Sequence, residues 1–251
     1  MVSTAFRLTE MELRHDALAA GGTPLTLVHL SDLHLRRWGR EHEELARMVN
    51  GWDADFVFVT GDFLSRLPES LELTGRLVRQ LRSRYGSFLC RGNWEVVWGP
   101  PLRRLKSRVQ SWGAELLSNQ SRLFHTRAGR VQVGGIDDLW RGAPDLEAAC
   151  RPAEGGADLT ILLSHAPLAA TLLAPGHHVD VVLSGHTHGG QVRVPWLWRL
   201  FLPPGHGGFT DGWHEVNGVR LCVSRGFGTG GPLPFRFRCP AEVALFRVRG
   251  G

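Results

Sequence analysis

Five short apolar runs in this sequence each end in side chains that can bind metal ions. The side chains are of the Asp, Asn and His types, and no cysteine is among them. They are Asp32, His34, Asp62, Asn93, His165, His186 and His188. Carboxylate, amide and imidazole ligands without thiolate suit Mn, Fe or Zn in a catalytic site better than a structural zinc site. The residue types therefore predict a catalytic metal centre.

Seven ligands are more than one metal ion needs. One carboxylate that bridged two ions would use all seven, and two-metal sites of this kind cleave phosphoesters. Each motif alone has an ordinary structural explanation, because Asp-x-His and Gly-Asp occur in turns and a single buried histidine is often a core residue. The Gly-His-x-His-Gly-Gly stretch from Gly185 is more specific, since packing rarely explains two imidazoles so close together after an apolar strand.

The elements that must position these side chains alternate between strand-like and helix-like runs. Strands that end in the polar residues are predicted at 26–30, 55–60, 88–91, 158–164 and 179–184. Helices are predicted at 41–50, 68–84, 101–112, 144–151 and 167–174, and two further strands at 121–127 and 130–135. Ligands in α/β folds bind at the carboxyl ends of strands, so the five ends are expected to form one site. The tail from Gln191 onward is predicted to form β-hairpins, which favours two packed sheets over one doubly wound sheet.

The composition is ordinary for a globular protein. The chain has 251 residues, of which 43% are hydrophobic and 21% charged, and its formal net charge is +5. This length can bury a sizeable core, and we expect a single domain over residues 1–251. The positive charge fits an anionic substrate or surface, or simply a solvated basic face. No apolar run is long enough to span a membrane, and the four cysteines form no C-x-x-C pair, so a cytoplasmic location is expected.

The order of these motifs resembles that of the calcineurin-like metallophosphoesterase superfamily. The resemblance covers residues 25–249, and the stretches GHTHGGQVRVP at 185–195 and GGIDD at 134–138 are similar to a bacterial branch with phosphodiesterase and lipid-linked members. The resemblance implies an α/β fold, a four-layer α-β-β-α sandwich of two mixed sheets, with a dinuclear metal site. Mn is the first expectation for both ions, with Fe and Zn as alternatives.

The resemblance also assigns the ligands to two metal positions. One ion would be held by Asp32, His34, Asp62 and His188. The other would be held by Asp62, Asn93, His165 and His186, so that Asp62 bridges the pair. By the same resemblance, Asp62 and Asn93 are the expected catalytic residues.

Two positions depart from the family pattern. Ser65 stands where Gly-Asp-x-x-Asp usually ends, but that aspartate is usually not a ligand. Trp94 stands where a histidine usually follows Gly-Asn, and that histidine acts on the leaving group. A general acid matters most for an alkoxide leaving group and little for a phosphate, so Trp94 indicates either a substrate with a good leaving group or a site without catalysis. The retained ligands favour the first.

The leaving-group argument leads to a specific hypothesis. UDP-2,3-diacylglucosamine hydrolases of lipid A synthesis belong to the same superfamily, and some lack this histidine. The first hypothesis is therefore hydrolysis of the pyrophosphate of UDP-2,3-diacylglucosamine to UMP and a lipid monophosphate. The alternatives are a general phosphodiesterase that acts on a nucleotide or phospholipid, and a non-catalytic metal-binding interaction module.

Several residues are candidates for substrate or membrane contact. Trp94 is expected to offer a stacking face or an apolar wall to the substrate. Arg36 or Arg37, with Arg37 as the first choice, is expected to bind its phosphate. The aromatic stretch 194–204 and the basic, tryptophan-edged stretch 96–108 fit a peripheral contact with an anionic membrane at its inner face. The ordinary alternatives are core packing for the first stretch and a solvated helix face for the second. No nucleic-acid partner is expected.

Overall fold

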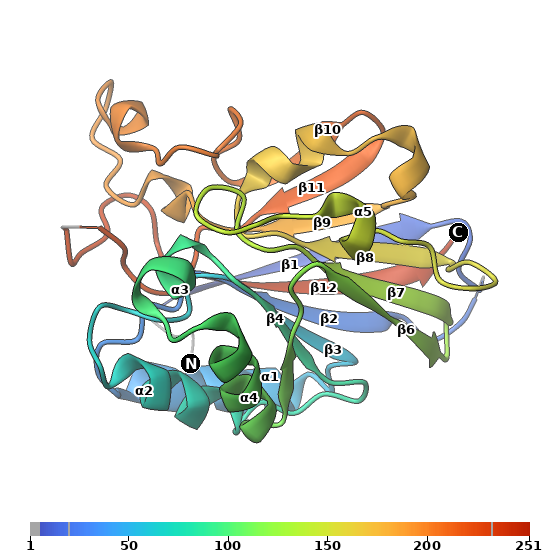
Figure 1. Ribbon diagram of the computed structural model, residues 1–251, viewed down its shortest axis with the longest axis horizontal. Coiled ribbons are helices and arrows are strands. Elements are labelled where there is room, and N and C mark those ends of the chain that lie inside the picture. Colours follow the sequence, from blue (N-terminus) through green and yellow to red (C-terminus); the bar gives the residue numbers. More distant parts are fainter. Residues whose placement is uncertain (1–5, 20, 232) are drawn as a thin grey trace.

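Two six-stranded sheets pack face to face in the described part of the chain, which comprises residues 6–19, 21–231 and 233–251 of the computed structural model (Figure 1). The strand order is β1-β12-β2-β3-β4-β5 in the first sheet and β10-β11-β9-β8-β7-β6 in the second. Helices cover the outer face of each sheet (Figure 1). The four-layer α-β-β-α sandwich of two mixed sheets expected from the sequence is thus confirmed.

The first sheet combines a parallel series with an antiparallel junction. Strands β2 to β5 pair in parallel, β12 pairs antiparallel with β2, and β1 pairs parallel with β12. The strands are β1 (Arg7–His15), β2 (Leu25–Leu30), β3 (Phe56–Thr60), β4 (Ser87–Cys90), β5 (Ala114–Leu116) and β12 (Glu242–Gly250). The helices between them are α1 (Arg40–Gly51), α2 (Ser70–Val78), α3 (Asn93–Trp98) and α4 (Leu102–Ser111).

The second sheet has a parallel centre and antiparallel edges. Strands β7, β8, β9 and β11 run parallel, while β6 and β10 close the two edges. The strands are β6 (Gln120–Thr126), β7 (Gly129–Gly135), β8 (Leu159–Leu163), β9 (Val181–Ser184), β10 (Gly212–Val216) and β11 (Val219–Val223). The helix α5 (Leu146–Ala149) is followed by four 3-10 helices: η1 (Pro167–Leu172), η2 (Pro175–His177), η3 (His188–Gly190) and η4 (Trp198–Phe201).

Three apolar layers hold these elements together. Strand β2 is buried on both faces: Leu25 and Leu27 belong to the core between the sheets, while Val28 and Leu30 face the core beneath the helices. A third core joins the second sheet to α5 and η1. Continuous apolar strands are typical of sheets covered on both sides, because side chains alternate between the two faces.

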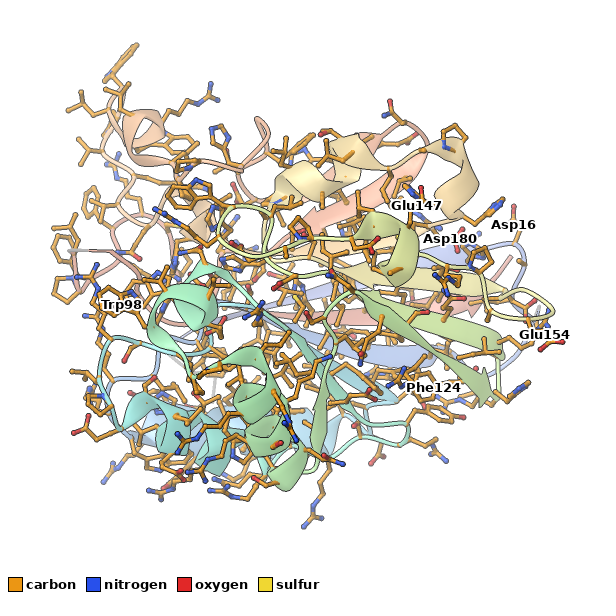
Figure 2. The ribbon with its side chains drawn as sticks, in the orientation of Figure 1. Asp16, Trp98, Phe124, Glu147, Glu154 and Asp180 are labelled. Atoms are coloured by element: carbon orange, nitrogen blue, oxygen red, sulfur yellow. The ribbon has the colours of Figure 1, made fainter. Side chains whose placement is uncertain are left out.

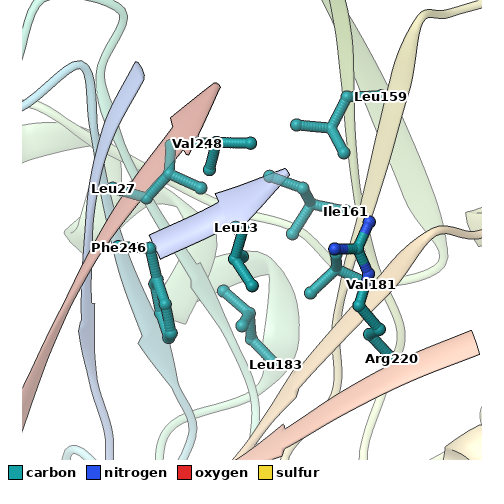
Figure 3. A pocket seen from close by; sticks show the side chains of 9 residues that line it. All are labelled: Leu13, Leu27, Leu159, Ile161, Val181, Leu183, Arg220, Phe246 and Val248. Atoms are coloured by element: carbon teal, nitrogen blue, oxygen red, sulfur yellow. The ribbon is translucent and has the colours of Figure 1, made fainter. Parts of the chain in front are cut away.

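The space between the sheets is filled almost completely. A cavity of about 10 Å³ remains beside Arg220, and the other side chains that line it are apolar (Figure 3). This volume is about the smallest that admits one water molecule, so the cavity is a packing gap and offers no room for a ligand.

The structure corrects the sequence-based prediction of four elements. Strand β1 lies in an N-terminal segment for which we predicted no strand, and β12 enters the first sheet instead of forming a hairpin in the tail. The stretch 191–195, which was expected to form a hairpin strand, makes only an isolated bridge, between Val192 and Phe237. The helix predicted at 167–174 is the 3-10 helix η1. Only the β10–β11 pair is a hairpin of the expected kind.

All four cysteines are buried and unpaired. Within the described residues, no helix combines the length and the apolar character that a membrane span requires.

Candidate metal centre

The five strand ends predicted to carry ligands meet at one end of the two sheets. Strands β2, β3 and β4 lead from the first sheet to Asp32 and His34, to Asp62 and to Asn93. Strands β8 and β9 lead from the second sheet to His165, and to His186 and His188. The site therefore lies where the carboxyl ends of both parallel series face each other, as the sequence predicted.

One group of ligand atoms comes from Asp32, His34 and His188. These atoms lie within 4.8 Å of one another. The Nε2 atoms of His34 and His188 are 3.2 Å apart, and His188 Nε2 is 3.3 Å from Asp32 Oδ1. Three donors of this kind that converge on one point can hold a divalent cation.

A second group comes from Asp62, His165 and His186, again within 4.8 Å of one another. The Nε2 atom of His165 is 3.3 Å from Asp62 Oδ2 and 3.0 Å from His186 Nδ1. The same Asp62 Oδ2 lies 3.6 Å from His34 Nε2 of the first group. One carboxylate oxygen thus faces both groups.

Backbone hydrogen bonds fix the orientation of three of the imidazoles. Atom Nδ1 of His34 lies 3.0 Å from the carbonyl of Leu64, and Nδ1 of His165 lies 2.9 Å from that of Thr60. Atom Nε2 of His186 lies 2.6 Å from the carbonyl of Pro204. In each ring the nitrogen that faces a carbonyl can donate to it, so the other nitrogen points into the site and can bind a metal when it is unprotonated.

The ligand positions have an unusual backbone. Asp32, His34, Asp62, His186 and His188 all have a positive φ, between 41° and 71°. Residues with a side chain avoid this region, and such strain persists only where the surroundings impose it, often at functional sites. Five of the twelve non-glycine residues with a positive φ in the described part of the chain are thus candidate ligands.

Two buried oxygen atoms fit a bound cation. Asp32 Oδ1 and Asn93 Oδ1 have no hydrogen-bond partner among the described residues, although neither atom is exposed to solvent. A buried acceptor without a partner is costly, and coordination of a metal would remove this cost. The atoms present thus suit the two metal ions that the ligand set implies.

The charge states point the same way. Burial acts to raise the pKa of Asp32 and of Asp62, but the neighbouring imidazoles, His188 for Asp32 and His165 for Asp62, hold both values below the usual range. Burial lowers the pKa of His34 and His188, whereas the Asp62 carboxylate raises that of His165 against the effect of burial. Ionised carboxylates beside mostly neutral imidazoles form a ligand set ready for metal.

Glu95, which follows Trp94, is fully buried and belongs to neither of the two groups of ligand atoms. Its carboxylate accepts hydrogen bonds from the backbone N–H groups of Asp62, Leu64 and Gly92, each at 2.8 Å. Burial, and next the charge of Asp62, raise the pKa of Glu95 to about 8. Glu95 therefore joins the turn after β3 to the start of α3 and fixes Asp62 relative to Asn93.

Gly230 comes from a distant loop and lies directly against the first ligand group. A Cβ at this position would lie 2.5 Å from His188 Nε2 and 3.2 Å from His34 Nε2. It would thus occupy the space in front of both lone pairs, although Gly230 has no positive φ that would itself exclude alanine.

Gly230→Ala is accordingly expected to lower the metal content of the purified chain to about half, because the added methyl blocks one of two positions. Mass-spectrometric metal analysis measures this. Gly176→Ala is the matched control, since a Cβ there meets nothing within 4 Å. Equal metal content in the two variants would contradict this assignment of the first group.

A pocket of about 780 Å³ opens beside the ligands. Asp62, Asn93, His186 and His188 form part of its wall, and the rest is largely apolar. Trp94 lies at the junction, with its ring 4.5 Å from that of His34 in an edge-on contact. Trp94 is therefore part of the pocket wall, and its contact with a substrate stays a prediction.

The cationic side chains in this wall are Arg66 and Arg141. The guanidinium of Arg66 lies 5.4 Å from the ring of Trp94 and 5.0 Å from that of Trp98. The predicted phosphate ligand Arg37 is not part of the wall, because its side chain is 79% exposed and lies 3.4 Å from Glu41.

The GGIDD motif explains how Arg141 reaches the pocket. Asp138 Oδ2 accepts hydrogen bonds from the backbone N–H groups of Trp140 and Arg141, at 3.1 and 2.6 Å. Asp137 pairs with Arg91 at the end of β4, with Arg91 Nε donating at 2.8 Å. The motif therefore holds the loop with Trp140 and Arg141 at the mouth of the pocket. The GGIDD motif is visible in the sequence, but the residues around it do not indicate that Arg141 lines a pocket.

Comparison with known proteins agrees with this geometry. The family model described as calcineurin-like phosphoesterase matches residues 25–190. The chain is 33% identical to the uncharacterized metallophosphoesterase YkoQ of Bacillus subtilis over 70% of its own length and 65% of that protein. It is 26% identical to the phosphodiesterase YaeI of Escherichia coli, over 90% of this chain and 82% of that one.

A solved structure shares the fold. The NAD nucleotidase of Haemophilus influenzae superposes with a TM-score of 0.55 at 12% identity, over 82% of this chain and 51% of that one. Neither curated relative has a name that assigns a lipid A substrate, so the comparisons support the family without the specific branch that the sequence suggested.

Proposed function

Because this chain belongs to the calcineurin-like phosphoesterase family, and is thus an enzyme of the metallophosphoesterase type, we propose that it hydrolyses a phosphodiester or phosphoanhydride bond. The substrate that contains this bond would also carry an apolar group. The observation that carries this proposal is a pocket whose wall joins the ligand residues to tryptophan and aliphatic side chains. A phosphate at the ligands and an apolar group against Trp98 and Leu233 would fill it together.

The ligand assignment is part of the proposal. Asp32, His34, Asp62 and His188 would hold one ion, and Asp62, Asn93, His165 and His186 the other, with Mn as the first candidate for both. Bound metals would polarise the phosphoryl oxygens and stabilise the charge that develops on them. The support comes from the two convergent groups and the unpartnered Asn93 Oδ1.

The chain's own side chains would orient the substrate. Arg66 and Arg141 are the cations of the pocket wall, and a guanidinium binds phosphate oxygens through two parallel N–H donors. Trp94 would exclude water from the leaving group and offer it no proton, since an indole N–H does not ionise in this range. We therefore propose that the leaving group is one that departs without a general acid.

The first substrate to test is UDP-2,3-diacylglucosamine, because its pyrophosphate supplies such a leaving group and its acyl chains match the apolar wall. The alternative is a general phosphodiesterase for a nucleotide or phospholipid, which the resemblance to YaeI favours. A metal-holding module without turnover is the third proposal. Release of UMP by the parent chain, and none by Asn93→Ala, would support the first.

Trp94→His is expected to change the leaving-group preference. An imidazole at this position can protonate an alkoxide, so hydrolysis of an alkyl phosphodiester should rise about 10²-fold relative to that of bis-p-nitrophenyl phosphate. Trp94→Ala should instead raise KM for an apolar substrate, because the wall beside His34 is lost. Steady-state kinetics on both esters measure these effects.

The matched control for this prediction is Trp98→His, which changes another tryptophan of the same wall. It should leave the ratio of the two rates unchanged. An equal ratio in the parent and in both variants would contradict the role given to Trp94.

A further inference from the structure

Exposed apolar side chains gather around the mouth of the pocket. Among the described residues, thirteen large hydrophobic side chains are exposed, and six of these also line the pocket. The six are Val97, Trp98, Trp140, Val194, Leu197 and Leu233. Four more belong to the same loops: Trp196, Leu200, Phe235 and Phe237. A concentration of this size on one face marks an interaction surface, whereas scattered exposed residues need no explanation. We call these ten residues the apolar rim.

The loops that carry the apolar rim are joined to each other. The backbone N–H of Arg193 donates to the carbonyl of Phe237, and that of Phe237 donates to the carbonyl of Gln191, both at 2.9 Å. The two loops project from the end of the sandwich at which α3 lies, and Trp98 stands at that edge (Figures 1 and 2). Trp196 is 95% exposed and Leu200 77%, so the rest of the chain covers neither.

The two loops that carry most of the apolar rim contain no acidic residue. The stretches 186–204 and 225–240 contain no Asp or Glu. The side chains of Arg199 and Arg238 are exposed, and their guanidinium groups lie 5.4 and 5.5 Å from the rings of Trp198 and Phe237. Arg66 and Arg141 are exposed at the pocket itself. Tryptophan, leucine and phenylalanine beside arginine, without acidic residues, are typical of segments that lie in the interface of an anionic membrane.

We propose that the apolar rim docks the chain on an anionic lipid bilayer, with Trp196 and Leu200 at the level of the upper acyl chains. Arg199 and Arg238 would lie among the headgroup phosphates. Charge complementarity selects the bilayer as the partner, and the pocket mouth within the rim would admit a lipid-linked phosphoester directly from it. This use of the surface rests on the proposed function, but the docking itself does not require catalysis.

Sedimentation with vesicles tests the docking. We expect the purified chain to bind vesicles of equal parts phosphatidylcholine and phosphatidylglycerol, and to bind pure phosphatidylcholine vesicles much more weakly. The double variant Trp196→Ser, Leu200→Ser should lose about tenfold or more in partitioning, because its apolar anchors are gone. Arg199→Glu with Arg238→Glu should lose a similar amount on the anionic vesicles, since each basic residue near the surface contributes about fivefold.

Two controls match these variants on other faces. Leu172→Ser removes a leucine that is 50% exposed but outside the apolar rim, and Arg151→Glu reverses an exposed charge elsewhere. Both should bind as the parent does. The proposal is overturned if the parent does not bind anionic vesicles at low salt, or if the rim variants bind as well as the controls. It is also overturned if the rim proves to join two copies, which ultracentrifugation would reveal as a dimer that the serine variant loses.

Docking and catalysis can fail separately. Bis-p-nitrophenyl phosphate is water-soluble, so the serine double variant should hydrolyse it at the parent rate, because Trp196 and Leu200 lie outside the pocket wall. Vesicle binding without hydrolysis by the parent would reject the proposed function and keep the docking. Hydrolysis without vesicle binding would reject the docking and keep the proposed function.

Discussion

Asp62→Asn is expected to lower kcat on any phosphoester substrate on the order of 10³-fold or more, and to release most of the bound metal. The reason is the place of this carboxylate: Asp62 Oδ2 faces His34 Nε2 at 3.6 Å and His165 Nε2 at 3.3 Å. This oxygen thus faces both candidate ligand groups, and an amide at this position would remove its charge. Turnover and metal content, measured on the same preparation, test this.

The control for this variant is Asp53→Asn. Asp53 is exposed, and its φ of 48° matches the 49° of Asp62, so the same substitution meets the same backbone conformation away from the site. Asn tolerates this conformation, so both variants should fold. The control should keep both its metal content and its rate. If Asp62→Asn also kept both, this carboxylate would not bridge the two metal positions.

Glu95→Ala is expected to lower the free energy of unfolding by about 3 kcal/mol or more, because three buried backbone N–H groups lose their acceptor. Glu95→Gln should be intermediate, since one carbonyl oxygen can still serve Asp62 and Gly92 but not Leu64. Activity in the folded fraction should fall about 10- to 100-fold, because Asp62 and Asn93 are no longer fixed relative to each other.

Urea unfolding and metal analysis measure these effects, with Glu154→Gln as an exposed control. A role limited to stability would leave metal content and rate unchanged in the folded fraction of the Gln variant. Equal stability of all three variants would contradict the role given to the three hydrogen bonds.

The meeting of the candidate metal ligands could be predicted from the sequence because each one closely follows an apolar strand. Parallel strands bring their carboxyl ends together, so local patterns sufficed to assemble Asp32, Asp62 and His186 in one place. The resemblance then divided the ligands between two positions, and the two groups of convergent atoms agree with that division for the six Asp and His ligands.

The pocket wall could not be predicted in the same way. Gly230 and Arg66 reach the site from loops whose paths depend on contacts with distant segments, so no local pattern marked them. Arg37, by contrast, is close to His34 in the sequence, which favours it as a phosphate ligand. Its side chain instead lies beside Glu41. Within a loop, closeness to a ligand along the chain does not predict whether a side chain reaches the site, because loop side chains point in no regular pattern.

Two strands were misread for a related reason. Strand β1 is an edge strand of which only Leu13 is buried, so its alternating charges concealed it. Strand β12 was expected to pair with its neighbours in the tail, but it crosses to the first sheet and lies between β1 and β2. The apolar pattern of β12 predicted a strand correctly and could not specify the sheet.

The most direct test of the central claim is a single hydrolysis assay with Mn²⁺ on three substrates, with Asn93→Ala as the blank. The substrates are UDP-2,3-diacylglucosamine, bis-p-nitrophenyl phosphate and an alkyl phosphodiester. We expect turnover of the first two by the parent, little of the third, and none by the variant. No turnover of any substrate by a parent chain that holds its metals would contradict the claim, and Trp94 would then mark a binding module.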